Sequence, residues 1–290
     1  MVIVKLISGL GNQLFQYAFG RQMALINNLP LKLDTSFYET QHLRGYLLNH
    51  YNINAQIATK KDIDSVLKPG DPVSKLQRYF SGNNKYYYKE RKWWGYDPTL
   101  LSIKRKRAYL DGYWQNYKYY NKIDEQVLSE FTLVDEVELL GYKTYSKILH
   151  DESSVSIHIR RGDYITDCEA NKTMGVLPMS YYYNAISNVM QNVPNARFYI
   201  FSDDLNWAAD HLKIDNPVTL VDIANGQKDY LELNMMSKCR HNIIANSTFS
   251  WWAGLLNKNS DKIVIGPKDW VATPEVNAGV ELLFPEWLKL

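Results

Sequence analysis

The chain has little cysteine, no long apolar run and almost no net charge. Its two cysteines, Cys168 and Cys239, lack CxxC spacing, so neither a disulfide framework nor a cysteine metal site is expected. No apolar run approaches the roughly 18 residues that span a bilayer, and Lys5 interrupts the first apolar stretch, unlike a signal peptide. The 33 basic and 31 acidic residues are interspersed, which gives no argument for nucleic acid as a partner. We therefore expect a cytoplasmic protein.

Aromatic residues, by contrast, are plentiful. They make up 13% of the 290 residues, with 22 Tyr and 8 Trp. Most of them are expected in the core, but aromatic rings also stack on the faces of sugars. A carbohydrate-binding module would account for the aromatic content, although it would not need the charged strand ends described below.

The spacing of apolar segments along the chain changes near residue 150. Residues 35–150 read as irregular, apart from one strand-like segment at 107–115 and helical patterns near 123–149. From residue 155 onward strands and helices alternate, with strand-like segments "VSIHIRRG", "ARFYIFSDD", "VTLVD", "HNIIAN" and "KIVIGP". This alternation predicts a parallel sheet with crossover helices. We expect an α/β fold with two domains, residues 1–150 and 151–290.

The stretch "ISGLGNQLFQYAFGRQMA", residues 7–24, follows an apolar strand and leads into a helix-like pattern. Gly9 and Gly11 match the first two glycines of the dinucleotide fingerprint, and Asp34 ends the next strand-like run. Leu14, however, occupies the place of the third glycine. A dinucleotide-dependent oxidoreductase therefore remains an alternative. The amide of Asn12 at the helix start suits a polar ligand better than a core.

Three of the later strand-like segments end in polar residues, where open parallel sheets bind ligands. In "VSIHIRRGDY", alternation places His158 and Arg160 on one face of a strand that we expect to be covered on both sides. A guanidinium there is costly unless an anion meets it. Arg160, and with it Arg161, is predicted to clamp a phosphate, because the planar fork binds phosphate oxygens bidentately. The alternative is a salt bridge from Arg160 to Asp163 that shapes the turn.

The other two strand ends carry acids and hydroxyls. Asp203 and Asp204 follow "YIFS" and allow three interpretations: a metal site, a helix cap, or an acceptor for a base edge. In "IIANSTFSWWAGLL" a strand stops at Asn246, and the hydroxyls of Ser247 and Thr248 crowd the start of a helix. Several hydroxyls together with free backbone N–H groups make a good anion site.

Four segments, "GLGNQLFQYA", "HIRRGDY", "FSDD" and "NSTFSWWAGLLN", in this order resemble the bacterial α-1,2-fucosyltransferases of glycosyltransferase family 11. The resemblance extends over essentially the whole chain and is weakest between residues 35 and 105. It implies a GT-B fold, with two Rossmann-like domains facing each other across a cleft, the first on the acceptor side and the second binding the GDP-sugar. It also implies that the glycine turn at residues 9–11 faces the donor pyrophosphate and the acceptor, rather than a nicotinamide.

The resemblance further implies transfer of L-fucose from GDP-fucose to the 2-hydroxyl of a terminal galactose, with inversion and without a metal or other cofactor. The acceptor would be an oligosaccharide or lipid-linked glycan of a surface polysaccharide, and any membrane association would be peripheral, through that acceptor. GDP-colitose is the alternative donor.

Residue roles follow from the same resemblance. Arg160 would hold the β-phosphate with help from Ser247, Thr248 and the backbone N–H groups near Phe249. Gly11 and Asn12 would close from the first domain. His158 and one acid of the Asp203–Asp204 pair would read the guanine edge, since a carboxylate suits guanine's N–H donors. The implied catalytic residues are Asn12, Arg160 and Asp163, with Asp167 and Glu169 as other candidates for a general base. The implied donor-binding residues are Gly11, His158, Arg160, Arg161, Asp203, Asp204, Asn246, Ser247, Thr248 and Phe249.

Overall fold

The computed structural model describes residues 1–40, 45–68, 85–102, 104–223 and 228–290, without the side chains of residues 163, 169 and 170. The chain forms two compact units, Met1–Val134 and Asp135–Leu290. Each unit is built on its own parallel sheet. The expectation of an α/β fold with two sheet-based units is therefore confirmed.

The sheet of the first unit has the strand order β3-β2-β1-β5-β4. Its strands are β1 (Val2–Lys5), β2 (Leu31–Asp34), β3 (Gln56–Ile57), β4 (Tyr87–Lys89) and β5 (Ala108–Asp111). All pairs are parallel, so the carboxyl ends of these strands lie at one edge. The strands β3 and β4 lie in the region that the sequence presents as irregular, because they are short, exposed or half-buried, and belong to no longer apolar run.

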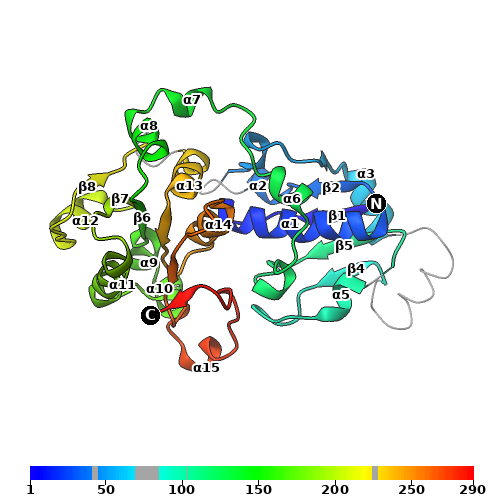
Figure 1. The fold of residues 1–290 in the computed structure, drawn as a ribbon. Coiled ribbons are helices and arrows are strands. Elements are labelled where there is room, and N and C mark those ends of the chain that lie inside the picture. The colour runs from blue at the N-terminus through cyan, green and yellow to red at the C-terminus, as the bar shows by residue number, and fades with distance from the viewer. Residues whose placement is uncertain (41–44, 69–84, 103, 224–227) are drawn as a thin grey trace. The chain divides into compact units, whose positions relative to one another are not determined.

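Helix α1 (Leu10–Asn27) runs along β1 in the first unit (Figure 1). Gly20 permits the close approach, since a Cβ there would lie 3.1 Å from the Cβ of Val4. The close packing that the missing third glycine would have supplied thus comes from a later glycine in the same helix. The buried Arg21 donates to the buried Glu130 at 2.9 Å, and the Tyr17 hydroxyl also donates to that carboxylate. This cluster ties α1 to the segment after α6 (Glu125–Ser129).

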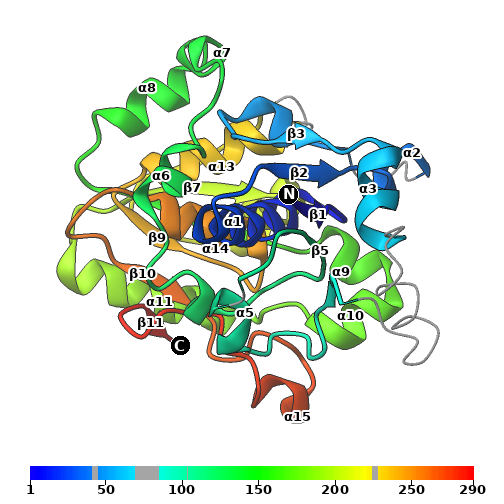
Figure 2. The ribbon, with the colours of Figure 1, turned by 90° about the vertical axis from the view of Figure 1, so that its right-hand side faces the viewer.

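Helix α3 (Lys60–Leu67) lies beside this sheet (Figure 2). Its Val66 packs in a core cluster with Ile3 and Tyr109. Its start is closed by a capping box between Thr59 and Asp62. The other described helices of the first unit are short. They are α2 (Phe37–Thr40), η1 (Leu48–His50), α5 (Pro98–Ser102) and η2 (Tyr117–Tyr119).

The sheet of the second unit has the order β11-β10-β9-β6-β7-β8, and all its pairs are parallel. Its strands are β6 (Ser154–Ile159), β7 (Arg197–Ser202), β8 (Val218–Leu220), β9 (His241–Ile243), β10 (Val264–Gly266) and β11 (Leu288–Lys289). The five strands expected after residue 155 are all present. The last strand, β11, was not expected, because its two residues show no pattern.

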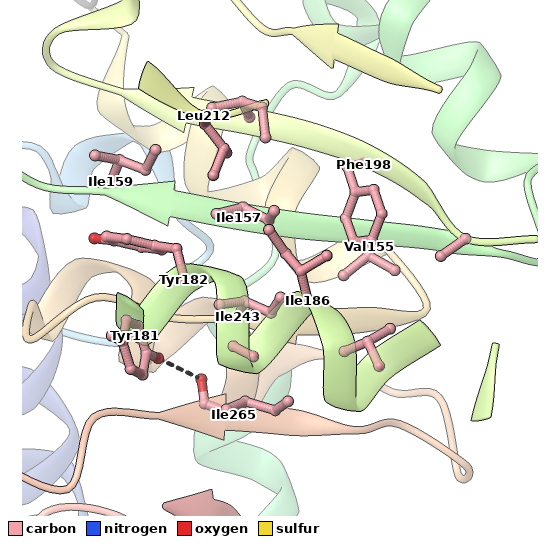
Figure 3. Packing of buried hydrophobic residues seen from close by; sticks show 14 of the residues in the cluster. Val155, Ile157, Ile159, Tyr181, Tyr182, Ile186, Phe198, Leu212, Ile243 and Ile265 are labelled. Carbon is pink, nitrogen blue, oxygen red and sulfur yellow. Dashed lines mark hydrogen bonds between the residues drawn. The ribbon is translucent and has the colours of Figure 1, made fainter. Parts of the chain in front are cut away.

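The apolar face of β6 packs against α11 (Met179–Asn192) (Figure 3). Val155, Ile157 and Ile159 project into this core, together with Phe198 of the neighbouring strand β7. The Tyr181 hydroxyl donates to the backbone carbonyls of β10 and of the residue after β9, at 3.2 and 2.6 Å, so even its polar end is satisfied. The strand is therefore held in place by apolar contacts on this side.

The opposite face of β6 is also buried, and Ser156 finds a hydrogen-bond partner there. The Asn242 side chain donates to the Ser156 hydroxyl at 2.8 Å and to the carbonyl of Met236 at 2.8 Å. The Asn257 side chain in turn donates to the Asn242 side-chain carbonyl at 2.7 Å. This small hydrogen-bond network explains how Ser156 can lie on a strand in the middle of a covered sheet.

The remaining described helices of the second unit connect and cover these strands. They are α7 (Val137–Leu140), α8 (Lys143–Leu149), α9 (Gly162–Thr166), α10 (Cys168–Met174), α12 (Leu205–His211), α13 (Asp229–Lys238), α14 (Thr248–Leu256) and α15 (Pro274–Asn277). The units divide after residue 134 rather than near 150, because α8 packs on α13 and Glu138 of α7 pairs with Lys228. Among the helices that the structure describes, none has both the length and the apolar character needed to cross a membrane.

Replacing Asn242 with Ala should lower the free energy of unfolding by about 1–3 kcal/mol, because Ser156 and Asn257 lose their buried partner. Urea denaturation of the purified variant measures this change. Asn192→Ala is the control, since that exposed side chain bonds only within its own helix and should cost less than about 0.5 kcal/mol. Equal costs for the two variants would show that the network contributes no net stability.

Candidate active site

The three polar strand ends predicted from the sequence lie together at the carboxyl edge of the second sheet. Strand β6 pairs with β7 on one side and with β9 on the other, so the residues after all three strands are neighbours. Contacts between side chains join them. Arg160 pairs with Asp203 after β7, and the Tyr164 hydroxyl donates to the backbone carbonyl of Asn246 after β9 at 3.0 Å. The edge therefore gathers residues that are far apart in the sequence.

Arg160 and Arg161 are both organised by Asp203. One Asp203 oxygen lies 2.9 Å from Arg160 Nη1, and the other accepts from the backbone N–H of Arg161 at 2.8 Å. Gly162 makes room for this carboxylate, since a Cβ there would lie 2.8 Å from Asp203 Oδ2. The partner found for Arg160 is thus an acid on the neighbouring strand. The side chain of Asp163, the partner considered from the sequence, lies outside the described residues.

Asp204 caps the following helix. Its carboxylate accepts from the backbone N–H of Trp207 at 3.1 Å, which closes the start of α12. Its other oxygen lies 3.5 Å from Arg161 Nε, and the Arg161 guanidinium stacks over the Trp207 ring at 3.6 Å. This cation–π contact orients Arg161 through the face of its guanidinium. The N–H groups at the edge of the guanidinium stay available to bind oxygen atoms.

The start of α14 presents hydroxyls and backbone N–H groups. The Ser247 hydroxyl accepts from the N–H of Phe249 at 3.4 Å as the helix cap, and the side chain of Thr248 is partly exposed. The Ser250 hydroxyl is buried and accepts from the backbone N–H of Ala245. Asn246 is 1% exposed, and its amide donates to backbone carbonyls of the loops around residues 174 and 270. Asn246 therefore stabilises the backbone at this edge through buried hydrogen bonds.

His158 lies under the same edge. It is 5% exposed, its ring centroid is 5.5 Å from that of Phe249, and Nδ1 has no hydrogen-bond partner among the described residues. Burial, reinforced by the charge of Arg160 and opposed by Asp203, lowers the pKa of His158 to about 4. The imidazole is therefore neutral at pH 7, and its Nδ1 is free of hydrogen bonds to the described residues.

Sequence reasoning did not single out Glu232, a half-buried acid of α13 that lies close enough to Asp203 for the charge of that residue to affect its pKa. Burial, together with the negative charges of Asp229, Asp222 and Asp203, raises the pKa of Glu232 to about 8. The carboxyl is therefore protonated at pH 7 and is a hydrogen-bond donor. The available signal was the spacing of Asp229 and Glu232 in the first turn of a helix that follows a strand of the parallel sheet.

The three candidates for a general base fall around α9 and α10. Asp167 lies between these helices and is exposed. The side chains of Asp163 and Glu169 are outside the described residues. In the parts of the chain that the structure describes, no group of three or more His, Cys, Asp or Glu side chains is placed to hold a metal ion.

In the first unit, the glycine turn forms a network of its own. The Asn12 side chain donates to the Ser8 hydroxyl at 2.9 Å and accepts from the Gln115 amide at 2.6 Å. Gly9 stands at the helix N-cap, where no side chain caps the backbone, and Gly11 is buried within the first turn. The turn thus holds the Asn12 amide in one orientation at the carboxyl edge of β1.

Asp34, the acid that would bind the ribose in a dinucleotide enzyme, is hydrogen-bonded within the protein. It is 4% exposed, accepts from the hydroxyl of Tyr109, and accepts from the backbone N–H of Ser36 at 3.0 Å. Leu14 is fully buried in the core. These residues are therefore explained by folding and give no support to a nicotinamide site.

Two parallel-sheet units, with arginines and a helix start at one sheet edge, define an α/β protein of the GT-B type. Solved structures agree on the fold. The fucosyltransferase NodZ from Bradyrhizobium matches with a TM-score of 0.51 and 13% identity over 88% of this chain and 92% of that chain. Arabidopsis thaliana FUT1 in complex with GDP matches with a TM-score of 0.52 and 13% identity over 91% of this chain and 69% of that chain.

The sequence comparisons identify the family. Residues 1–290 match the model of glycosyl transferase family 11, and the chain belongs to that family. The alpha-1,2-colitosyltransferase of Escherichia coli is 31% identical over 96% of this chain and 95% of its own length. The O-antigen biosynthesis glycosyltransferase WbnK of Escherichia coli is 31% identical over 98% and 99%. The chain is therefore a glycosyltransferase, and membership in this family replaces the oxidoreductase alternative.

The raised pKa of Glu232 predicts a pH dependence of stability. In the unfolded chain the carboxyl loses its proton near its ordinary pKa of 4.5, whereas the folded protein keeps the proton up to about pH 8. The free energy of unfolding should therefore fall as pH rises through this window, because the folded state binds the extra proton. Glu232→Gln should flatten this fall and raise the melting temperature at pH 8 more than at pH 5.

The control for this experiment is Glu275→Gln, which changes an exposed glutamate of α15 in the same unit. Melting temperatures of both variants and of the unaltered protein are measured from pH 4.5 to 8.5 by scanning calorimetry. Parallel curves for Glu232→Gln and the unaltered protein would show that Glu232 ionises normally in the folded state.

Proposed function

We propose that this glycosyltransferase moves L-fucose from GDP-fucose to the 2-hydroxyl of a terminal galactose, forming an α-1,2 linkage with inversion, in the synthesis of a surface polysaccharide. The acceptor is an oligosaccharide or a lipid-linked glycan, and any membrane association is peripheral, through that acceptor. No metal or other cofactor takes part. The second unit binds the GDP-sugar, and the first unit serves the acceptor.

The observation that carries this proposal is the arginine pair at the end of β6. Breaking the bond between the sugar and the β-phosphate leaves negative charge on GDP, which fixed donors must stabilise when no metal does so. Arg160 is held 2.9 Å from Asp203, yet its side chain is 20% exposed, so it is oriented in advance and accessible. Arg161 and the start of α14, with Ser247 and Thr248, supply further donors at the same edge.

The same edge offers a place for guanine. The unpartnered Nδ1 of the neutral His158 and the neighbouring Phe249 ring combine a polar atom with a flat apolar surface. The carboxylates of Asp203 and Asp204 accept from N–H donors, although both already serve within the protein. We assign the guanine contacts to His158 and to one of these two acids, of which Asp204 has the more exposed side chain, at 39%.

The acceptor hydroxyl loses a proton during transfer, and a carboxylate near α9 is the proposed general base. Asp163 is the first candidate, with Asp167 and Glu169 as the others. In the first unit, Gly11 and Asn12 are proposed to contact the donor pyrophosphate or the acceptor hydroxyl. The network of Asn12 with Ser8 and Gln115 would keep its amide oriented for that contact.

A second donor, GDP-colitose, is favoured by one comparison. The relative named alpha-1,2-colitosyltransferase is 31% identical over 96% of this chain. Colitose differs from fucose by lacking one ring hydroxyl, so the phosphate and guanine contacts would be the same for both donors.

Transfer assays with GDP-fucose and GDP-colitose, each against a panel of lactose, N-acetyllactosamine and galactosyl-β1,3-N-acetylgalactosamine, test the function and choose the donor. Methylation analysis of the product then assigns the linkage. Activity should persist in EDTA. Thermal shift with GDP and with NAD gives an independent binding test, because a ligand of the folded state raises the melting temperature. Stabilisation by NAD but not by GDP would refute the proposal.

Arg160→Ala should lower kcat by about 100- to 1000-fold, as for the loss of one preorganised donor to developing charge, while the protein stays folded. The measurement pairs steady-state kinetics with calorimetry on one preparation. Arg240→Ala is the matched control, since Arg240 is a 39% exposed arginine of the same unit, paired with the exposed Glu152. Near-normal turnover in Arg160→Ala would remove Arg160 from the catalytic machinery.

A further inference from the structure

The carboxyl edge of the first sheet contains unusual backbone conformations. Among the described residues, Ser8, Trp94 and Trp114 have positive φ angles of 71°, 58° and 58°. They follow β1, β4 and β5, so all three lie after strands that end at this edge. A positive φ is strained for a side chain as large as tryptophan, and such strain persists where surrounding contacts enforce it, often at ligand sites.

Specific hydrogen bonds hold this strained backbone. The Glu90 carboxylate accepts from the backbone N–H groups of Tyr113 and Trp114, at 2.7 and 3.2 Å. Gly112 is required beside it, because a Cβ there would lie 2.5 Å from the Glu90 Cβ. The side chain of Asn116 donates to the carbonyl of Trp94 at 2.9 Å. The segments after β4 and β5 are thus locked to each other.

The result of this locking is an aromatic platform, formed by Trp93, Trp94 and Tyr113. Trp93 stacks on Trp94 with ring centroids 4.3 Å apart and 5° between planes, and Tyr113 lies 5.6 Å from Trp93 at 23°. Trp94 is buried, but Trp93 is 48% exposed. Nearly half of Trp93 is therefore accessible to a ligand, while Trp94 and Tyr113 both stack on its ring and hold it in place.

Neutral polar groups adjoin the platform. Tyr113 lies close enough to Tyr38 to contribute, after burial, to a raised pKa of the Tyr38 phenol. The Tyr38 hydroxyl donates to the carbonyl of Ser8 at 2.9 Å, and Ser8 bonds to the Asn12 amide. Amides and phenols that stay neutral at pH 7 suit hydroxyl groups better than they suit phosphates.

We propose that the aromatic platform binds a pyranose ring of the acceptor glycan, with the apolar face of the sugar against the exposed part of Trp93 and its hydroxyls toward the network of Tyr38 and Asn12. This assignment rests on the proposed function, because it makes the first unit the acceptor side. Glu90 is a positioning residue, which acts on the platform through the backbone of Tyr113.

The charges near the platform favour a neutral sugar over a nucleotide. Lys5, on the strand beside β5, is paired with Asp111 at 3.6 Å, and the Tyr87 hydroxyl also donates to that aspartate. The carboxylate of Glu90 would repel a phosphate. The paired arginines that suit a pyrophosphate, Arg160 and Arg161, belong to the second unit.

The test is Trp93→Ala, assayed with the galactoside from the panel above that gives the highest transfer. The KM for that galactoside should rise about tenfold, the size expected for one lost aromatic stack, while kcat and the Kd for GDP change less than about twofold. Trp93→Phe should restore most of the loss, because it retains a flat ring. Tyr183→Ala, which removes a 39% exposed aromatic ring from α11, should leave the KM unchanged.

Two outcomes would overturn the assignment. One is an unchanged KM for the galactoside in Trp93→Ala, and the other is a weakened GDP affinity with an unchanged galactoside KM, which would make the platform a base-stacking site. If the unaltered protein binds no GDP and transfers to no galactoside, the proposed function fails instead. Saturation-transfer NMR with lactose then tests the platform by itself, since Trp93→Ala should abolish the contact and an equal signal in both proteins would refute it.

Discussion

Two arginines, Arg160 and Arg161, follow the buried central strand β6, and the carboxylate of Asp203 compensates their charge there. Strand β6 is buried along its whole length, so Arg160 and Arg161 leave the sheet where an unpaired cation would be costly. Asp203 binds the guanidinium of one and the backbone of the other. Gly162 leaves room for that carboxylate, and Asp204, next in the chain, closes the start of α12. One electrostatic requirement thus organises the ends of two strands and the helices that follow them.

The two sheets use the same architecture for different chemistry. Both are parallel, so each gathers the residues after its strands at one edge. In the second unit that edge carries Arg160, Arg161 and the start of α14, which suit an anion. In the first unit it carries stacked rings, such as Trp93, and amides, such as Asn12, which suit a neutral polar ligand. This difference supports a division of donor and acceptor between the units, because the proposed donor carries a charged diphosphate and the proposed acceptor is a neutral sugar.

Much of the fold was predictable from the sequence. The five strands predicted after residue 155, and a helix between each successive pair, are present in the predicted order, because each strand lies in a short apolar run. The helices α9, α10 and α15 and the strand β11 were not predicted. The same reasoning was weak between residues 35 and 150. Strands β3 and β4 are two and three residues long, and they take their place in the sheet from pairing with neighbours rather than from their own composition. The helical pattern near 123–149 is broken into α6, α7 and α8.

By itself, the sequence determined which residues end the strands, since the polar residues stand directly after apolar runs in "VSIHIRRGDY", "YIFSDD" and "IIANSTF". Only the tertiary structure decided what each of them does. Asp203 became the partner of Arg160, 43 positions earlier, and Asn246 turned its amide to backbone carbonyls of two loops. The raised pKa of Glu232 likewise depends on acids brought together from separate segments. The physical reason is that partners, burial and charge at a sheet edge depend on which strands are neighbours, and β6 acquires both β7 and β9 only when the chain folds.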